Sequence, residues 1–375
     1  MNNSPLNNSP QNDPSQNELP PNAPPLNIET KNLSKADRQK KISYTPFVIA
    51  FFAVILVAII AFYVFIFINN KYIFNYATND DKTTCTIISI DEKAVAPGLY
   101  FPSTLKIPDS IDGLKVTAIG ANAADGSERI KTLSLPEGIV SIKNSAFESC
   151  TKLKKVTLSN SVAEIGENAF KDCIALEELS LGSGLKVIGK RAFEGCSKIT
   201  SVTLPGTVLS LGKRAFYGCT SLTEIKLSAA LVEIADEAFW ACTSLTSVDI
   251  PASVKSIGEY AFWGCSSLES VNLGSVQAIG TSAFRLCTAL KSVTIPSGVT
   301  IIENKTFAGC KSLESLTLPK SLQGIGERNF DNCTALTSIT YSGTKTEWSN
   351  VGLEIYWDFN SSVTKISCTD GDVTP

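Results

Sequence analysis

The sequence predicts a mainly β repeat solenoid of the α/β type, built from about ten coils of about 23 residues with short strands and helical turns. Between positions 150 and 333, every step but one from cysteine to cysteine is 23 residues. The step from Cys265 to Cys287 is 22, because "IPASV" in one unit becomes "LGSV" in the next. The missing residue falls in a surface turn, so the inward positions of successive coils remain aligned.

A phenylalanine stands three residues before each cysteine, and alanine precedes it except at Thr306 and Asn329. A large and a small apolar residue at fixed spacing indicate one core shared by stacked coils. The pairs are Phe147 and Cys150, Phe170 and Cys173, Phe193 and Cys196, Phe216 and Cys219, Phe239 and Cys242, Phe262 and Cys265, Phe284 and Cys287, Phe307 and Cys310, and Phe330 and Cys333.

The rest of each unit supplies two short extended pieces and a turn. In the unit that begins at Cys150, "VTL" alternates inward and outward as a strand, and "VAEIG" turns two further apolar residues inward. The segment "ENAFKDC" is expected to be a helical turn that closes the coil. A degenerate unit with Ala124 and Ser127 at the Phe and Cys positions precedes these, as terminal repeats often are. The predicted inward positions are Cys150, Leu153, Val156, Leu158, Val162, Ile165, Ala169 and Phe170.

The nine cysteines of the repeat are predicted to be reduced, buried and structural. Free cysteine packs as a small hydrophobe. Equivalent side chains of stacked strands point in parallel, about 4.8 Å apart, and do not converge as a disulfide requires. A straight ladder also does not gather four ligands around a metal ion. Cys85 and Cys368 lie at opposite ends of the rod, too far apart to bridge each other.

Composition excludes several classes of function. The chain has no histidine and a formal net charge of −3. Without histidine, every His-dependent nucleophile, base and metal ligand is lost, and the net charge gives no global attraction to nucleic acid. We therefore predict no enzymatic activity, no catalytic residue, no metal, no cofactor and no nucleic-acid partner.

The segments outside the repeats predict how the chain is displayed. Residues 1–45 are rich in Asn, Pro, Ser and Gln and are expected to be a disordered cytoplasmic tail. Residues 46–69 carry an uncharged apolar run long enough for one transmembrane helix. Residues 70–104 would then be an extracellular juxtamembrane cap. This orientation follows from the cations before the run, which are Lys31, Lys35, Arg38, Lys40 and Lys41.

Two rows of outward positions suggest where a ligand binds. The position after the phenylalanine reads Tyr217, Trp240, Trp263 and Arg285 in four consecutive coils, and aromatic and arginine side chains are typical of binding hot spots. The outward strand position is mostly Ser or Thr but becomes Lys226 and Asp249 in mid-rod. Both rows have structural alternatives: rings that only stack on each other, and an ordinary surface ion pair.

The repeating unit, seen as "CTSLTSVDIPASVKSIGEYAFWG", resembles the BspA-type leucine-rich repeat over residues 105–341. The segment "LKIPDSIDGLKVTAIG" is similar to the opening unit of such proteins, and residues 342–375 are similar to their closing cap. The resemblance implies a leucine-rich repeat rod, display on the cell surface and binding to host proteins, matrix or other cells. It transfers no catalytic residue. An N-terminal anchor differs from the cleaved signal or C-terminal anchor frequent in that family.

Together these features predict a single-pass membrane protein with a cytoplasmic N-terminus and its repeat domain on the cell surface. Its function would be adhesion, with a rigid rod presented to an extracellular or host protein, another cell-surface ligand or a glycan. The alternative is a structural or sensory envelope protein whose tail couples external binding to a cytoplasmic partner.

Overall fold

The computed structural model describes residues 45–93 and 103–375. The chain divides into two compact units, Met1–Ala61 and Phe62–Pro375. Helix α1 (Thr45–Tyr72) crosses this boundary, and its side chains are described at residues 48–61, where all are exposed. Neither this stretch nor any other described part of the chain contains a helix with the length and hydropathy of a membrane span. The expected disordered tail lies outside the described residues.

Two rows of short strands run along the second unit. The first row, which we name the long-strand face, consists of β3 (Thr104–Lys106), β6 (Thr132–Ser134), β8 (Lys155–Thr157), β10 (Glu178–Ser180), β12 (Ser201–Thr203), β14 (Glu224–Lys226), β16 (Ser247–Asp249), β18 (Ser270–Asn272), β20 (Ser292–Thr294), β22 (Ser315–Leu318), β24 (Ser338–Tyr341) and β26 (Lys365–Cys368).

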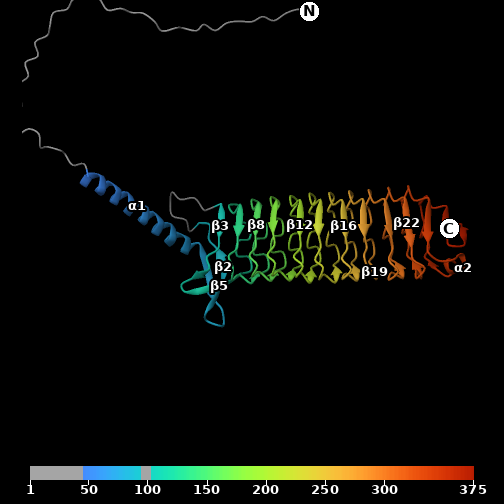
Figure 1. The fold of residues 1–375 in the computed structure, drawn as a ribbon, viewed down its shortest axis with the longest axis horizontal. Helices are drawn as coiled ribbons and strands as arrows, with labels where there is room; N and C mark the ends of the chain where they lie inside the picture. The colour runs from blue at the N-terminus through green and yellow to red at the C-terminus, as the bar shows by residue number, and fades with distance from the viewer. Residues whose placement is uncertain (1–44, 94–102) are drawn as a thin grey trace, which may run out of the picture. The chain divides into compact units, whose positions relative to one another are not determined.

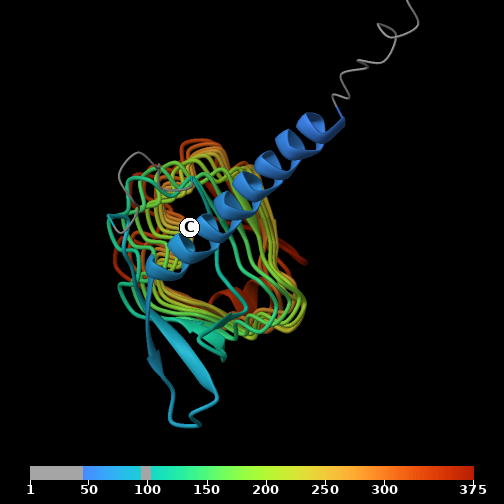
Figure 2. The same ribbon diagram turned by 90° about the vertical axis from the view of Figure 1, so that its left-hand side faces the viewer.

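The second row, the short-strand face, consists of β5 (Leu114–Ile119), β7 (Ser141–Ile142), β9 (Glu164–Ile165), β11 (Val187–Ile188), β13 (Ser210–Leu211), β15 (Glu233–Ile234), β17 (Ser256–Ile257), β19 (Ala278–Ile279), β21 (Ile301–Ile302), β23 (Gly324–Ile325) and β25 (Gly352–Leu353). Figure 1 shows the two rows on opposite sides of the coils, and Figure 2 shows successive coils overlying one another.

The strands pair in parallel at equivalent positions of neighbouring coils. Val156 lies opposite Leu179 on the long-strand face, and Ile165 lies opposite Ile188 on the short-strand face. The eleven strands of the short-strand face agree with the expected coil number of about ten. The mainly β solenoid predicted from the cysteine spacing is therefore confirmed.

The third side of each coil, the segments around the phenylalanines, is named the turn face. The helical turn expected there is not formed. Residues two before and two after each phenylalanine have positive φ, as at Asn168 (55°) and Asp172 (57°). Their N–H groups donate to the next coil, from Asn168 to Lys190 O at 3.0 Å and from Asp172 to Glu194 O at 2.7 Å. The prediction was wrong because these bonds run between coils, whereas an α-helix pairs residues along one chain segment.

Close stacking on the short-strand face depends on the glycine that follows the inward isoleucine or leucine. A Cβ on Gly212 would lie 2.5 Å from the backbone nitrogen of Lys190 in the preceding coil. Where Ala235 and Glu303 replace this glycine, the sheet is interrupted between β13 and β15 and between β19 and β21. Lys143, in the early coil of β7, is accommodated without an interruption.

The core is one continuous cluster along the rod. Every inward position predicted in the unit that begins at Cys150 is buried. The nine phenylalanine rings form a single stack with centroids 5.3 to 6.3 Å apart and interplanar angles of at most 12°. Large buried rings with parallel offset contacts contribute strongly to core stability.

The nine cysteines are buried and unbridged, as predicted. Each thiol also donates to the carbonyl of the residue at the phenylalanine position in the preceding coil, for example from Cys219 Sγ to Phe193 O at 3.3 Å and from Cys242 Sγ to Phe216 O at 3.2 Å. The sequence pointed to a small hydrophobe alone, whereas the structure adds a weak thiol donor to a carbonyl that already accepts a backbone N–H, as from Cys196 N to Phe193 O at 3.2 Å.

Different devices close the two ends. At the N-terminal end, β1 (Phe74–Thr78) and β2 (Thr84–Ile90) form an antiparallel hairpin, and β2 continues the short-strand face beside β5, as does β4 (Ser110–Ile111). At the C-terminal end, α2 (Lys345–Trp348) lies between β24 and β25, and β27 (Gly371–Val373) pairs antiparallel with β26. There Trp357 ends the phenylalanine stack, edge-on to Phe330 with centroids 5.9 Å apart. The aromatic edge covers the last ring face, which has no further coil to pack against.

Candidate functional site

The structure brings the three predicted aromatic residues together on the turn face. Tyr217 and Trp240 stack with ring centroids 5.7 Å apart, and Trp240 and Trp263 lie 4.4 Å apart with a 32° tilt. All three side chains are half-buried. Because the rings face one another along the rod, Trp240 has a ring on both sides, whereas Tyr217 and Trp263 each have this contact on one side.

Two members of this cluster were not predicted. Tyr260 lies 5.3 Å from Trp240, and the Arg214 guanidinium lies 5.2 Å from the Tyr217 ring centre. Both stand two residues before a phenylalanine, at the positive-φ position of their coils. The sequence contains this row at the same 23-residue spacing, but its proximity to the other row depends on the fold of the turn face. We name Tyr217, Trp240, Tyr260 and Trp263 the ring ladder.

On the N-terminal side of the ring ladder, charges are paired. Glu237 accepts from Arg214 at 2.6 Å and from Lys213 at 3.0 Å. Burial opposes the ionisation of Glu237, but these hydrogen bonds outweigh it and lower the pKa of the carboxyl group. Lys171 similarly pairs with Glu148 at 3.0 Å. The charges here compensate one another and leave little net attraction for a ligand.

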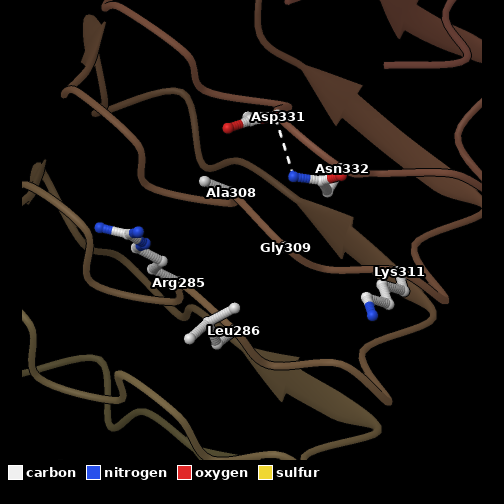
Figure 3. A pocket seen from close by; sticks show the side chains of 7 residues that line it. All are labelled: Arg285, Leu286, Ala308, Gly309, Lys311, Asp331 and Asn332. Carbon is white, nitrogen blue, oxygen red and sulfur yellow. Dashed lines mark hydrogen bonds between the residues drawn. The ribbon is translucent and has the colours of Figure 1, made fainter. Parts of the chain in front are cut away.

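On the C-terminal side, Arg285 borders a hollow of about 300 Å³. Figure 3 shows that the hollow crosses three coils, with Arg285 and Leu286 from one, Ala308 and Lys311 from the next, and Asp331 from the third. Asn332 and Gly309 complete its lining. Within the described residues, neither Arg285 nor Lys311 has an ion pair or a side-chain hydrogen bond.

The other two predicted contact residues lie on the long-strand face. Lys226 ends β14 and Asp249 ends β16, and both are exposed. The ion pair that the sequence suggested between them is not formed in the described part of the chain. The reason is that β14 and β16 belong to different sheets, so no ladder holds these side chains at a fixed spacing. Their role as ligand contacts stays a prediction.

The long-strand face also has two shallow hollows, of about 450 and 440 Å³, over β10 and β12. These strands too belong to different sheets. Both hollows are lined by Leu179, Ser180 and Ser201. Both linings are rich in hydroxyl groups. The hollow of about 440 Å³ is also lined by Lys155 and Glu178, which form an ion pair of 2.6 Å.

The described residues offer neither a metal site nor a reactive thiol in the cysteine ladder. Within residues 45–93 and 103–375, no group of three or more His, Cys, Asp or Glu is placed to hold a metal ion. Burial raises the pKa of the Cys242 thiol to about 12, so the reactive thiolate is scarce at neutral pH. Cys368, in β26, is half-buried and lies outside the ladder.

Comparison with solved structures finds leucine-rich repeat proteins from several bacteria. A leucine-rich repeat protein from Bacteroides ovatus is 23% identical, with 79% of this chain and 98% of that chain covered and a TM-score of 0.43. A leucine-rich repeat protein from T. pallidum is 26% identical over 58% of this chain and 88% of that one, with a TM-score of 0.44. A leucine-rich cell surface protein from Faecalibacterium prausnitzii is 24% identical over 75% and 96%, with a TM-score of 0.35.

A comparison with curated proteins gives no match. The family model described as the BspA type leucine rich repeat region matches in six copies, over residues 117–245, 186–312 and 232–358. These matches include the coils whose phenylalanine and cysteine ladders form the core. The chain therefore belongs to the BspA type leucine-rich repeat family.

Proposed function

We propose that this protein is a membrane-anchored cell-surface binding protein that presents its solenoid to an extracellular partner. The observation that carries the proposal is the ring ladder, where large aromatic side chains gather on a surface that the core does not require. Tyr, Trp and Arg are enriched among the residues that dominate the energetics of protein interfaces, and Tyr and Trp offer a large contact area with only about two rotatable bonds. A rigid repeat scaffold holds such side chains at fixed spacing and so reduces the entropy lost on binding.

The proposed anchor is α1. Its sequence is uncharged from Phe47 to Ile68, and its described side chains are exposed, with Phe51 at 64% and Val57 at 65%. Exposed apolar surface of this extent is unfavourable in water and favourable in lipid. Cations cluster before the helix, which supports a cytoplasmic N-terminus and an external repeat domain.

Protease treatment of intact cells tests this topology. We expect added protease to remove a tag at the C-terminus, beyond the repeats, and to spare a tag at the N-terminus. Permeabilised cells, in which both tags should be lost, provide the control. Loss of the N-terminal tag alone from intact cells would contradict the proposed orientation.

Binding is tested on the full-length chain in mild detergent, with immobilised extracellular-matrix proteins as the probe. Changing both Trp240 and Trp263 to Ala should weaken capture by about 2 kcal/mol. The fold should persist, because the neighbouring core phenylalanines are unchanged. The matched control is Lys226→Ser with Asp249→Ser on the long-strand face. If the control abolishes capture and the tryptophan variant does not, the long-strand face is the binding surface instead.

A further inference from the structure

The distribution of charge along the turn face changes at the ring ladder. In the N-terminal coils, the cations Lys171 and Arg214 each have an acidic partner within 3.0 Å. In the C-terminal coils, Arg285 and Lys311 border one hollow, and neither has a partner within the described residues. The chain thus leaves two cations uncompensated at the end of its exposed aromatic strip.

The repeat register places a third cation near Arg285. The contact of 5.3 Å between Trp240 and Tyr260 shows that the position after a phenylalanine adjoins the position two before the phenylalanine of the next coil. By the same register, Arg285 adjoins Lys305. Two neighbouring cations repel each other. An anion bound between them is therefore stabilised electrostatically more than an anion beside a single cation.

The acid that lines the hollow, Asp331, offsets only part of this positive charge. Asp331 accepts hydrogen bonds from Asn332 at 2.9 Å and from Asn360 at 3.4 Å. No ion pair joins it to Arg285 or Lys311 in the described part of the chain. Neutral amides orient this carboxylate but do not remove its charge, so a hollow lined by two cations and one acid keeps an excess of about one positive charge.

The ring ladder indicates which kind of anion-bearing partner fits. A sugar ring stacks on the open face of an aromatic ring, but here Trp240 is covered by neighbouring rings at 5.7 and 4.4 Å, and the Arg214 guanidinium lies over Tyr217 at 5.2 Å. Trp263 has a neighbouring ring on one side. The exposed ring edges instead suit the aliphatic and aromatic side chains of a protein. The observations therefore favour a protein segment over an acidic polysaccharide.

We propose that the turn face from Tyr217 to Lys311 docks an acidic protein segment, whose apolar side chains lie over the ring ladder and whose carboxylate enters the hollow between Arg285 and Lys311. This inference rests on the proposed binding function and specifies its partner. The partner segment would run along the rod axis, with its apolar part toward the N-terminal coils and its acidic part toward the C-terminal coils.

The test uses the full-length chain in mild detergent and fluorescent peptides that share one Trp- and Leu-containing half. The other half is rich in Glu, in Gln or in Lys. We expect the Glu peptide to bind at least about tenfold more tightly than the Gln peptide at low salt, an advantage that falls as salt rises. Arg285→Ala with Lys311→Ala should remove this advantage and leave the affinity for the Gln peptide unchanged. Lys106→Ala with Lys115→Ala, in β3 and β5 on the two strand faces, is the matched control.

Three results would overturn the inference. Equal affinity for the Glu and Gln peptides would show that the hollow does not select carboxylates, even where the ring ladder still binds both. Binding of polygalacturonate through Arg285 and Lys311, without binding of any peptide, would assign the site to an acidic glycan. Failure of all these probes would remove the acidic-segment proposal, whereas the proposed binding function would fall only if the tryptophan variant left matrix capture intact.

Discussion

The buried phenylalanine stack and the ring ladder both run along the rod, from neighbouring positions in the sequence, but they differ in burial and in ring geometry. Phe239 is fully buried and stacks with its neighbours at interplanar angles of 3° and 12°. Trp240, the next residue, is half-buried and meets Tyr217 and Trp263 at 28° and 32°. Packing on all sides aligns the buried rings, while the outer rings are covered only along the rod. A fully buried position accepts only one kind of ring in one orientation. A half-buried position constrains neither the residue type nor the ring orientation as strictly, so its side chain is available to contact a partner.

The largest effect is expected from alkali, which acts on the whole buried ladder at once. Burial raises the pKa of Cys242 and of Cys333 from 9.0 to about 12. Between those pH values the unfolded thiols lose their protons while the folded thiols keep them. The stabilisation present below pH 9 is therefore lost as the pH rises toward 12, by roughly 1 kcal/mol per pH unit for each of these two thiols.

Thermal unfolding followed by circular dichroism from neutral pH to above pH 10, with a reductant present, measures this loss. Lysine and tyrosine side chains also titrate there, so the variant with Cys219→Ala and Cys242→Ala is the control. Its stability should decline less steeply with pH than that of the parent chain. Parallel declines would show that the ladder thiols do not cause the alkaline instability.

A smaller effect separates the two aromatic ladders directly. Phe239→Ala should cost about 3–5 kcal/mol, because it removes a buried ring from the middle of the stack. Trp240→Ala should cost about 1 kcal/mol or less, since the tryptophan is only partly enclosed. Chemical unfolding of the two variants checks both values. Equal losses would mean that the ring ladder supports the fold and is not a surface free for binding.

The smallest effect concerns a single thiol. Cys219→Ala should cost about 1 kcal/mol through a small cavity and the loss of the donor to Phe193 O. Cys368→Ala, at a half-buried position outside the ladder, should cost less. The midpoint of chemical unfolding distinguishes them. A larger loss at Cys368 would indicate that the C-terminal cap limits stability more than the coils do.

Sequence reasoning was most successful where the repeat enforces the structure. The inward positions, the strand pairs and the buried thiols all follow from one period, because a coil that places Val156 inward must place Leu179 above it. It failed at the turn face, where "ENAFKDC" was expected to be helical. The alternative, hydrogen bonds between coils at residues with positive φ such as Asp172, requires the neighbouring coil to be present and cannot be read from one unit.

For the candidate site, the sequence by itself determined that Tyr217, Trp240, Trp263 and Arg285 share one row, because equal spacing places equivalent residues at equal positions. Only the tertiary structure decided what lies beside that row. Tyr260 joins it because the turn face brings two positions of adjacent coils into contact. The suggested ion pair between Lys226 and Asp249 is absent from the described residues because their strands belong to separate sheets. The spacing of the repeat determines which residues occupy equivalent positions in successive coils. Contacts between different positions of neighbouring coils depend on the backbone geometry of the folded coil, which the spacing alone does not give.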